Sequence, residues 1–129
     1  MTEKHVLIVD DDCNQLKILK KIVETICPNC RVWIAHNGYA ALNIISTRTA
    51  DTPFHLILTD YEMPHMNGLE FALAVRSLWP AVTIALMSGS GKEQMLANLT
   101  QQHNLNAYLK KPFGINRLEH LLNKTVTTP

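Results

Sequence analysis

The stretch VLIVDDD, residues 6–12, places an apolar segment of strand length directly before three adjacent carboxylates. Two carboxylates about 4 Å apart repel each other by roughly 4 kcal/mol at an effective dielectric constant near 20, so a folded protein that keeps such a cluster normally places a cation or a proton in it. The run Asp10, Asp11 and Asp12 therefore indicates a binding site at the end of this strand.

The last carboxylate of the run has a separate explanation. Residues 12–15, D-C-N-Q, match a capping box, in which the first side chain accepts hydrogen bonds from the opening backbone N–H groups of a helix. We therefore interpret Asp12 as a helix cap, and Asp10 and Asp11 as the two carboxylates that face the site.

Apolar segments of strand length alternate with segments of helical spacing along the chain. The strand candidates are VLIV (6–9), VWIA (32–35), FHLIL (54–58), VTIALM (82–87) and AYL (107–109). Nearly continuous apolar runs of this kind are typical of parallel strands covered on both faces. Helical spacing is found over residues 16–26, 39–46, 69–79, 92–102 and 115–122. Five alternations predict an α/β fold: a doubly wound five-stranded parallel sheet in a three-layer sandwich.

Length and composition are those of a single globular domain. The chain has 129 residues, 47% of them hydrophobic, and a net charge of +1 without a run of basic residues. This charge gives no electrostatic footprint for nucleic acid or for an anionic membrane. The apolar runs are far shorter than the roughly 20 residues that span a bilayer, and Thr2, Glu3 and Lys4 do not open a signal sequence. We expect a cytoplasmic protein.

Three cysteines are too few for a disulfide framework, but two of them form the motif CPNC, residues 27–30. This spacing suits a redox pair or half of a zinc site. We favour two reduced thiols in a loop, because no second CxxC and no HxxxH follows. The motif lies past the far end of the first predicted helix, roughly 20 Å from the acidic run, so any redox role would be separate from the site there.

The acidic residues predict a metal site at one edge of the sheet. In an open parallel sheet, ligands bind beyond the carboxyl ends of the strands. Asp10 and Asp11 follow the first predicted strand and Asp60 follows the third, so their carboxylates are expected at the same edge. Mg²⁺ takes oxygen ligands in an octahedron and is usually bound through a few carboxylates with water and phosphate oxygens.

The fourth and fifth predicted strands bring a hydroxyl and a cation to the same edge. The fourth ends at Ser88, followed by small residues that let a phosphate approach the backbone. The fifth ends in Lys110, Lys111 and Pro112, and alternation along the strand turns the two lysines to opposite sides. We favour Lys111 for the site, because a residue before proline is held extended, with a cis bond as one way to fix the turn. Mg²⁺ and one lysine would nearly neutralise the carboxylates, so that an aspartate can attack an anionic phosphate donor.

Four motifs stand in order along the chain: VLIVDDD (6–12), LILTDYEMPHMNGLE (56–70), ALMSGS (85–90) and YLKKPF (108–113). In order and spacing they resemble the response-regulator receiver domains of two-component signalling, over nearly the whole chain. The resemblance implies a flavodoxin-like sandwich with strand order 2-1-3-4-5. It also implies a receiver domain over residues 1–125 and a tail, 126–129, that is a candidate start of a linker.

The resemblance assigns the phosphoryl acceptor and the metal ligands. Asp60 is similar to the aspartate that takes a phosphoryl group from a histidine kinase or a histidine phosphotransfer protein. In such domains Mg²⁺, with Mn²⁺ as the alternative ion, is held by the carboxylates that correspond to Asp10, Asp11 and Asp60. The backbone carbonyl two residues after the acceptor, here that of Glu62, completes the protein ligands.

The resemblance also implies a switch. Ser88 corresponds to the hydroxyl that binds a phosphoryl oxygen, and Lys111 to the cation that pairs with the phosphoryl group. When Ser88 moves toward the new oxygens, Tyr108 turns inward as the aromatic switch residue, and the changed surface is read by a downstream protein. Serine stands where threonine is frequent, so the coupling to Tyr108 is expected to be looser. Asparagines in the turn 104–106, where glycine is usual, tolerate left-handed geometry.

Two alternative functions remain open from the residues. A degenerate receiver would act only as a protein-interaction module, without taking phosphate. A haloacid-dehalogenase-like phosphatase would use Asp10 as the nucleophile of a D-x-D motif, although Asn14 stands where that family has threonine or valine, and no aspartate follows Asp60. We favour a signalling domain that catalyses only its own phosphorylation and dephosphorylation over an enzyme acting on other substrates.

Overall fold

The computed structural model describes residues 3–49, 51–89, 91–112 and 114–125. They form a five-stranded sheet with strand order β2-β1-β3-β4-β5 and parallel pairing throughout, which confirms the predicted fold class and the expected strand order. The strands are β1 (Lys4–Val9), β2 (Cys30–Ala35), β3 (Leu56–Asp60), β4 (Thr83–Ser88) and β5 (Ala107–Lys110). The predicted tail, 126–129, lies outside the described residues, as does Ser90, the last residue of the ALMSGS motif.

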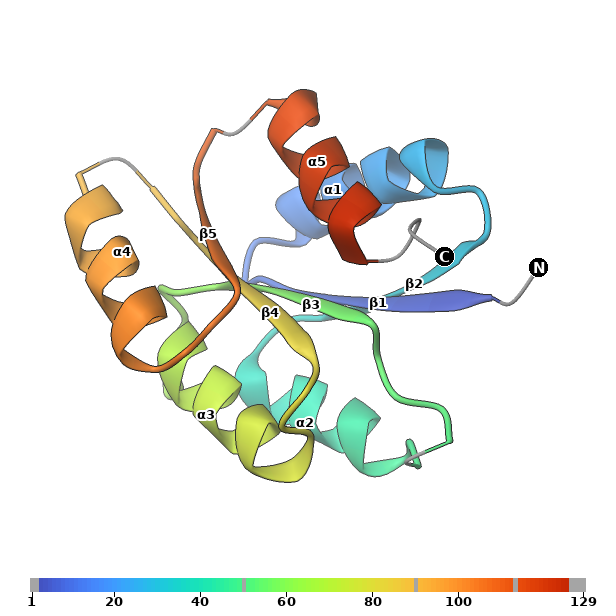
Figure 1. Ribbon diagram of the computed structural model, residues 1–129, viewed down its shortest axis with the longest axis horizontal. Helices are drawn as coiled ribbons and strands as arrows, with labels where there is room; N and C mark the ends of the chain where they lie inside the picture. The colour runs from blue at the N-terminus through green and yellow to red at the C-terminus, as the bar shows by residue number, and fades with distance from the viewer. Residues whose placement is uncertain (1–2, 50, 90, 113, 126–129) are drawn as a thin grey trace.

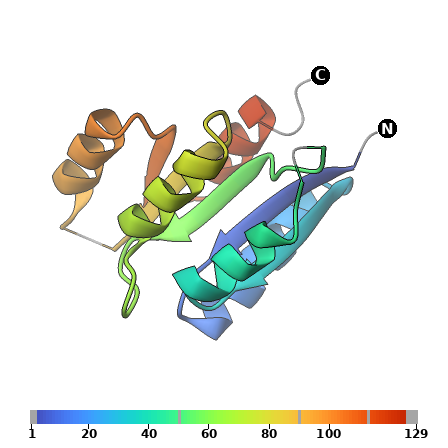
Figure 2. The same ribbon diagram turned by 90° about the horizontal axis from the view of Figure 1, so that it is seen from below.

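Helices cover both faces of the sheet, as Figure 1 shows, and the described residues form five of them. They are α1 (Cys13–Ile26), α2 (Gly38–Ser46), α3 (Gly68–Leu78), α4 (Glu93–Gln102) and α5 (Ile115–Thr125). Helices α1 and α5 pack on one face, and α2, α3 and α4 pack on the other, with α4 beside the β5 edge (Figure 2). No helix among the described residues is long and apolar enough to cross a membrane.

The alternation of side chains along β1 builds the two cores. Val6 and Ile8 pack on the face of α1 and α5, whereas Leu7 and Val9 pack on the face of α2 and α3, and all four are fully buried. Complete burial of one such side chain contributes roughly 1.5–3 kcal/mol, so the strand is held from both sides. The carboxyl end of β1 is thereby fixed, and with it the backbone that carries the acidic run.

Strand β3 begins and ends two residues later than its apolar run. The sequence predicted a strand over 54–58, but the ladder with β4 runs from Leu56 to Asp60. Phe54 is buried against the rings of Trp33 and Trp79 without being part of the strand. Tertiary packing therefore explains the apolar character of Phe54, and β3 extends through polar residues to the edge where the acidic run lies.

Asp12 caps α1 as predicted. Its carboxylate accepts hydrogen bonds from the backbone N–H groups of Asn14 (2.9 Å) and Gln15 (3.3 Å). In a complete capping box the Gln15 side chain would accept from the Asp12 N–H. Here the Asp12 N–H donates to Asp10 Oδ1 instead, at 3.0 Å. One peptide N–H thus joins the helix cap to the acidic site.

The turn before β5 confirms the expected tolerance of asparagine. Asn104 has a φ of +56°, in the left-handed region where asparagine is among the better tolerated side chains. The Asn106 side chain then accepts from the Ile84 N–H at 2.8 Å, which ties this turn to β4.

The interpretation of the CPNC motif as two reduced thiols was wrong for this structure. Cys27 and Cys30 form a disulfide, with Cα atoms 5.3 Å apart. The turn between α1 and β2 brings the two residues together, a geometry that the absence of other metal-ligand motifs did not reveal. Cys13 is a free, exposed cysteine.

Candidate functional site

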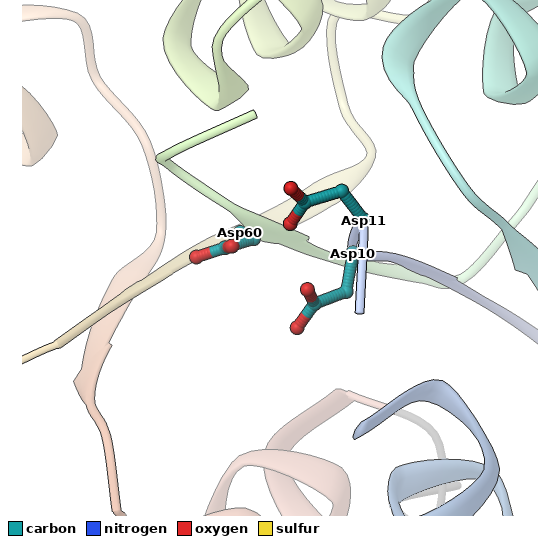
Figure 3. A group of neighbouring side chains, drawn as sticks. All are labelled: Asp10, Asp11 and Asp60. Atoms are coloured by element: carbon teal, nitrogen blue, oxygen red, sulfur yellow. The ribbon is translucent and has the colours of Figure 1, made fainter. Parts of the chain in front are cut away.

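Three carboxylates converge beyond the carboxyl ends of β1 and β3. Asp10 and Asp11 follow β1, and Asp60 is the last residue of the neighbouring strand β3, so their side chains lie next to one another in Figure 3. One oxygen from each carboxylate falls in a group whose atoms all lie within 4.8 Å of one another. Asp10 and Asp60 are buried and Asp11 is exposed. A cluster of carboxylate oxygens, open to water on one side, suits a hard divalent cation.

Lys111 reaches into this cluster from the end of β5. Its Nζ lies 2.8 Å from Asp10 Oδ2 and 3.4 Å from Asp60 Oδ1. Burial alone would lower the pKa of Lys111, but the hydrogen bond to Asp10 and the nearby charge of Asp60 outweigh burial, and the pKa is raised. Lys111 is therefore held as a cation between two of the three carboxylates.

The two adjacent lysines point in different directions. Lys110 points away from the cluster and pairs with Glu93 on α4 at 2.8 Å. The peptide bond between Lys111 and Pro112 is cis, and the Lys111 N–H donates to the Ser88 carbonyl at 2.6 Å. The ends of β4 and β5 are thus joined where the lysine enters the site.

Burial dominates the electrostatics of Asp60. It raises the pKa of this carboxyl from 3.8 to about 6; the Lys111 cation acts in the opposite direction, and the charges of Asp10 and Asp11 reinforce the rise. Without a metal ion, the fold therefore destabilises the ionised form of Asp60 relative to the same carboxylate in water. A divalent cation beside Asp60 would stabilise that form.

We expect the raised pKa of Asp60 to appear as a pH-dependent stability. An acid whose pKa is raised on folding binds its proton more tightly in the folded state, so its contribution to stability is complete below about pH 3.8 and is lost as the pH rises to about 6. Asparagine stays neutral throughout. Without divalent cations, the Tm of Asp60→Asn should exceed that of the wild type by little near pH 4 and by roughly 4 °C or more at pH 7, the shift that about 1 kcal/mol produces in a domain of this size.

Thermal unfolding in a chelator at several pH values measures this difference. Comparing the two proteins at each pH cancels the titration of the other carboxyl groups, which both share. A Tm difference that stays constant from pH 4 to pH 7 would contradict the raised pKa.

The Ser88 hydroxyl is fully buried at the end of β4 and already has a partner. Ser88 Oγ donates to Glu62 Oε1 at 3.2 Å, and Glu62 Oε2 lies 3.5 Å from Nζ of Lys92, the residue before α4. The sequence placed Glu62 beside the acceptor site, but it predicted neither the contact of the Glu62 side chain with Ser88 nor the ion pair with Lys92. Residues 26 positions apart carry no spacing signal for such a contact. The carbonyl of Glu62 as a metal ligand stays a prediction.

Tyr108 lies on β5 beside the fourth strand. It is the register partner of Leu86, two residues before Ser88, and its half-buried ring packs against the core on the α3 and α4 side. The Tyr108 carbonyl accepts from Arg117 of α5 at 3.0 Å. Tyr108 therefore lies near the Ser88 end of β4, on the strand that contributes to the surface formed by α4, β5 and α5.

Gly68 allows the backbone after Asp60 to fold back on itself. Its N–H donates to the Tyr61 carbonyl at 2.8 Å, and a Cβ at this position would overlap the Asp60 carbonyl oxygen and lie 2.8 Å from the Tyr61 Cα. Both atoms belong to the backbone and cannot rotate away. The capping box of Asn67 and Glu70 starts α3 at the same point.

Gly68→Ala should therefore lower the free energy of unfolding by about 1–3 kcal/mol, the usual cost of overpacking. Urea unfolding measures it. Gly89→Ala is the matched control, because a Cβ at Gly89 meets no atom within 4 Å. Equal losses in the two variants would show that the close approach at Gly68 does not matter.

Comparison with protein families gives a match over most of the chain. The family model of the response regulator receiver domain matches residues 6–123. The sensor histidine kinase GacS of Pseudomonas protegens is 32% identical over 127 residues, and the transcription factor SKN7 of Saccharomyces cerevisiae is 30% identical over 118 residues. These alignments cover 93% and 92% of this chain but only 13% and 18% of the two relatives.

Solved structures give the same fold. A signal receiver domain from an HD domain-containing protein of Pseudomonas fluorescens has a TM-score of 0.84 at 19% identity, covering 98% of this chain and 96% of that chain. A CheY-like response regulator receiver domain protein of Methanospirillum hungatei has a TM-score of 0.82 at 26% identity, covering 95% and 93% of the two chains.

Proposed function

The chain belongs to the response regulator receiver domain family of two-component signalling, and from this premise we propose that Asp60 accepts a phosphoryl group from a phosphohistidine donor in a Mg²⁺-dependent reaction. The observation that carries the proposal is the convergence of Asp10, Asp11 and Asp60 around Lys111. The donor is a histidine kinase or a histidine phosphotransfer protein.

The chain's own residues supply the nucleophile and the charge balance. An Asp60 carboxylate oxygen attacks phosphorus, the bond from phosphorus to the donor imidazole nitrogen breaks, and that nitrogen leaves with the bonding pair. Bound Mg²⁺ would neutralise charge on the transferring oxygens. Asp10, Asp11, Asp60 and the Glu62 carbonyl would hold it, with Mn²⁺ as the alternative ion. Lys111 keeps a positive charge beside Asp60 and pairs with the phosphoryl group afterwards.

Asp60 rather than Asp10 is the nucleophile in this proposal. Both oxygens of Asp10 are engaged, Oδ1 by the Asp12 N–H at 3.0 Å and Oδ2 by Lys111 at 2.8 Å. These two contacts stabilise the charge on both Asp10 oxygens and so lower their nucleophilicity, which disfavours the haloacid-dehalogenase alternative. Asp60 carries its raised pKa beside a cation and ends its strand at the open edge.

The switch proposal follows from the partner of Ser88. To bind a phosphoryl oxygen, the Ser88 hydroxyl must exchange its bond to Glu62 for one to the new group. This exchange would free the Glu62 side chain from Ser88. Because Glu62 also pairs with Lys92, the residue before α4, the start of that helix would be free to move with it. Tyr108 would then turn toward the space left at the end of β4, and a downstream protein would read the surface of α4, β5 and α5.

The remaining assignments are proposals of the same kind. We assign residues 1–125 to the receiver domain and 126–129 to a tail or linker start. The chain acts on itself rather than on other substrates, at a cytoplasmic location. The test is a mass measurement: acetyl phosphate with Mg²⁺ should add one phosphoryl group to the wild type, and a chelator should prevent the addition. An unchanged mass with Mg²⁺ present would favour the interaction-only alternative.

A further inference from the structure

The disulfide of Cys27 and Cys30 lies at the amino ends of β1 and β2, whereas the acidic cluster lies beyond the carboxyl ends of the strands. Cys27 is the C-cap of α1 and Cys30 opens β2, where its register partner is Lys4 at the start of β1. Asp10 follows the other end of the same strand β1. The chemistry of the disulfide is therefore separate in space from the phosphoryl site.

The disulfide is not needed to close the turn that contains it. The Cys27 N–H donates to the Val23 carbonyl at 2.8 Å, the Cys30 N–H to the Cys27 carbonyl at 3.0 Å, and the Lys4 N–H to the Asn29 carbonyl at 3.1 Å. These backbone bonds hold the turn without any bond between the sulfurs. A cross-link across a sequence separation of three also restricts the unfolded chain least, so stabilisation does not account for it.

The two cysteines differ in exposure. Cys27 is only 1% exposed and belongs to the core beneath α1 and α5, whereas Cys30 is partly exposed. An incoming thiolate or disulfide therefore reaches Cys30 first. The arrangement of one partly exposed and one buried cysteine residue, with Cα atoms 5.3 Å apart, fits an attacking cysteine and a resolving cysteine.

We propose that Cys27 and Cys30 form a reversible dithiol–disulfide site that exchanges with small disulfides, such as glutathione disulfide, through Cys30. The Cys30 thiolate attacks one sulfur of glutathione disulfide, which forms a mixed disulfide and releases one glutathione thiolate. The Cys27 thiolate then attacks the Cys30 sulfur and releases the second glutathione. Two protein thiols are oxidised, one glutathione disulfide is reduced to two glutathiones, and the two thiol protons pass to the leaving thiolates. In a reducing compartment, disulfides that do form are usually transient or redox-sensing.

The test uses the whole chain with Cys13→Ser, because free, exposed Cys13 would itself take up glutathione. The protein is equilibrated with mixtures of reduced and oxidised glutathione and quenched with acid. Its free thiols are then alkylated, and the intact mass of the protein is measured. We expect the population to move from no alkyl groups to two as the mixture becomes more reducing, while far-UV circular dichroism stays native. A disulfide that opens only when the protein unfolds would overturn the proposal, as would thiols that stay reduced in every mixture.

Two single-cysteine variants test the order of attack. In the Cys13→Ser background, Cys27→Ser should take up one glutathione at Cys30 in the native protein. Cys30→Ser should leave Cys27 unmodified in native buffer and modified in urea. Equal native reactivity of Cys27 and Cys30 would refute entry through Cys30. Should a variant fail to fold, the titration of the paired cysteines still decides whether the site is reversible.

Discussion

Asp60→Asn is expected to abolish the mass increase of one phosphoryl group that acetyl phosphate and Mg²⁺ give the wild-type protein. The amide keeps the shape of the side chain, but its neutral oxygen is a poor nucleophile and cannot form a stable acyl phosphate. Lys111 keeps its 2.8 Å contact with Asp10, so the rest of the site should stay in place. Intact-mass spectrometry at matched times measures the adduct directly.

Asp51→Asn provides the matched control for this experiment. It removes one aspartate charge from an exposed residue in the segment between α2 and β3. It should therefore be phosphorylated at the wild-type rate. A wild-type level of phosphoryl adduct on Asp60→Asn would place the acceptor at another residue and contradict the assignment of Asp60. Membership of the receiver family would not be affected.

Asp11→Asn is expected to weaken Mg²⁺ binding by at least about tenfold. Losing even a residue that only supports a metal ligand typically costs 10–100-fold in affinity, and Asp11 is proposed as a ligand itself. Its side chain is exposed and the ion pair of Asp10 with Lys111 remains, so the fold should be little affected. Isothermal titration calorimetry with MgCl₂ measures the affinity.

The neighbouring Asp12→Asn is the sharpest control, because it makes the same chemical change one residue away. The Asp12 carboxylate accepts from the Asn14 and Gln15 N–H groups, and asparagine caps a helix about as well as aspartate. Mg²⁺ affinity should therefore change by less than about threefold, the effect of a screened charge. Equal losses from Asp11→Asn and Asp12→Asn would mean that net charge, and not ligation, governs binding.

Local patterns were sufficient for most of the framework. Continuous apolar runs separated by helical segments predict parallel strands, and parallel strands end at one edge, so the meeting of Asp10, Asp11 and Asp60 followed from their positions after two strands. The two-residue period of a strand sends Lys110 and Lys111 to opposite sides, and the choice of Lys111 for the site followed from its position before Pro112.

The parts that the sequence did not reveal depend on contacts without a period. Phe54 looked like a strand residue because it is apolar, but packing against Trp33 and Trp79 is the reason for that character. The CPNC spacing was compatible with free thiols, a metal site or a disulfide, and the path of the turn decided among them.

The chain's order of apolar and polar residues determined the sheet, its two covered faces and the edge at which charged side chains gather, because those features depend on local periodicity and hydrophobic burial. Only the tertiary structure decided that the Ser88 hydroxyl donates a hydrogen bond to Glu62 and that the pKa of Asp60 rises to about 6. Both depend on the distances and the exclusion of water that arise when loops from separate strands pack together, and no stretch of sequence carries that information by itself.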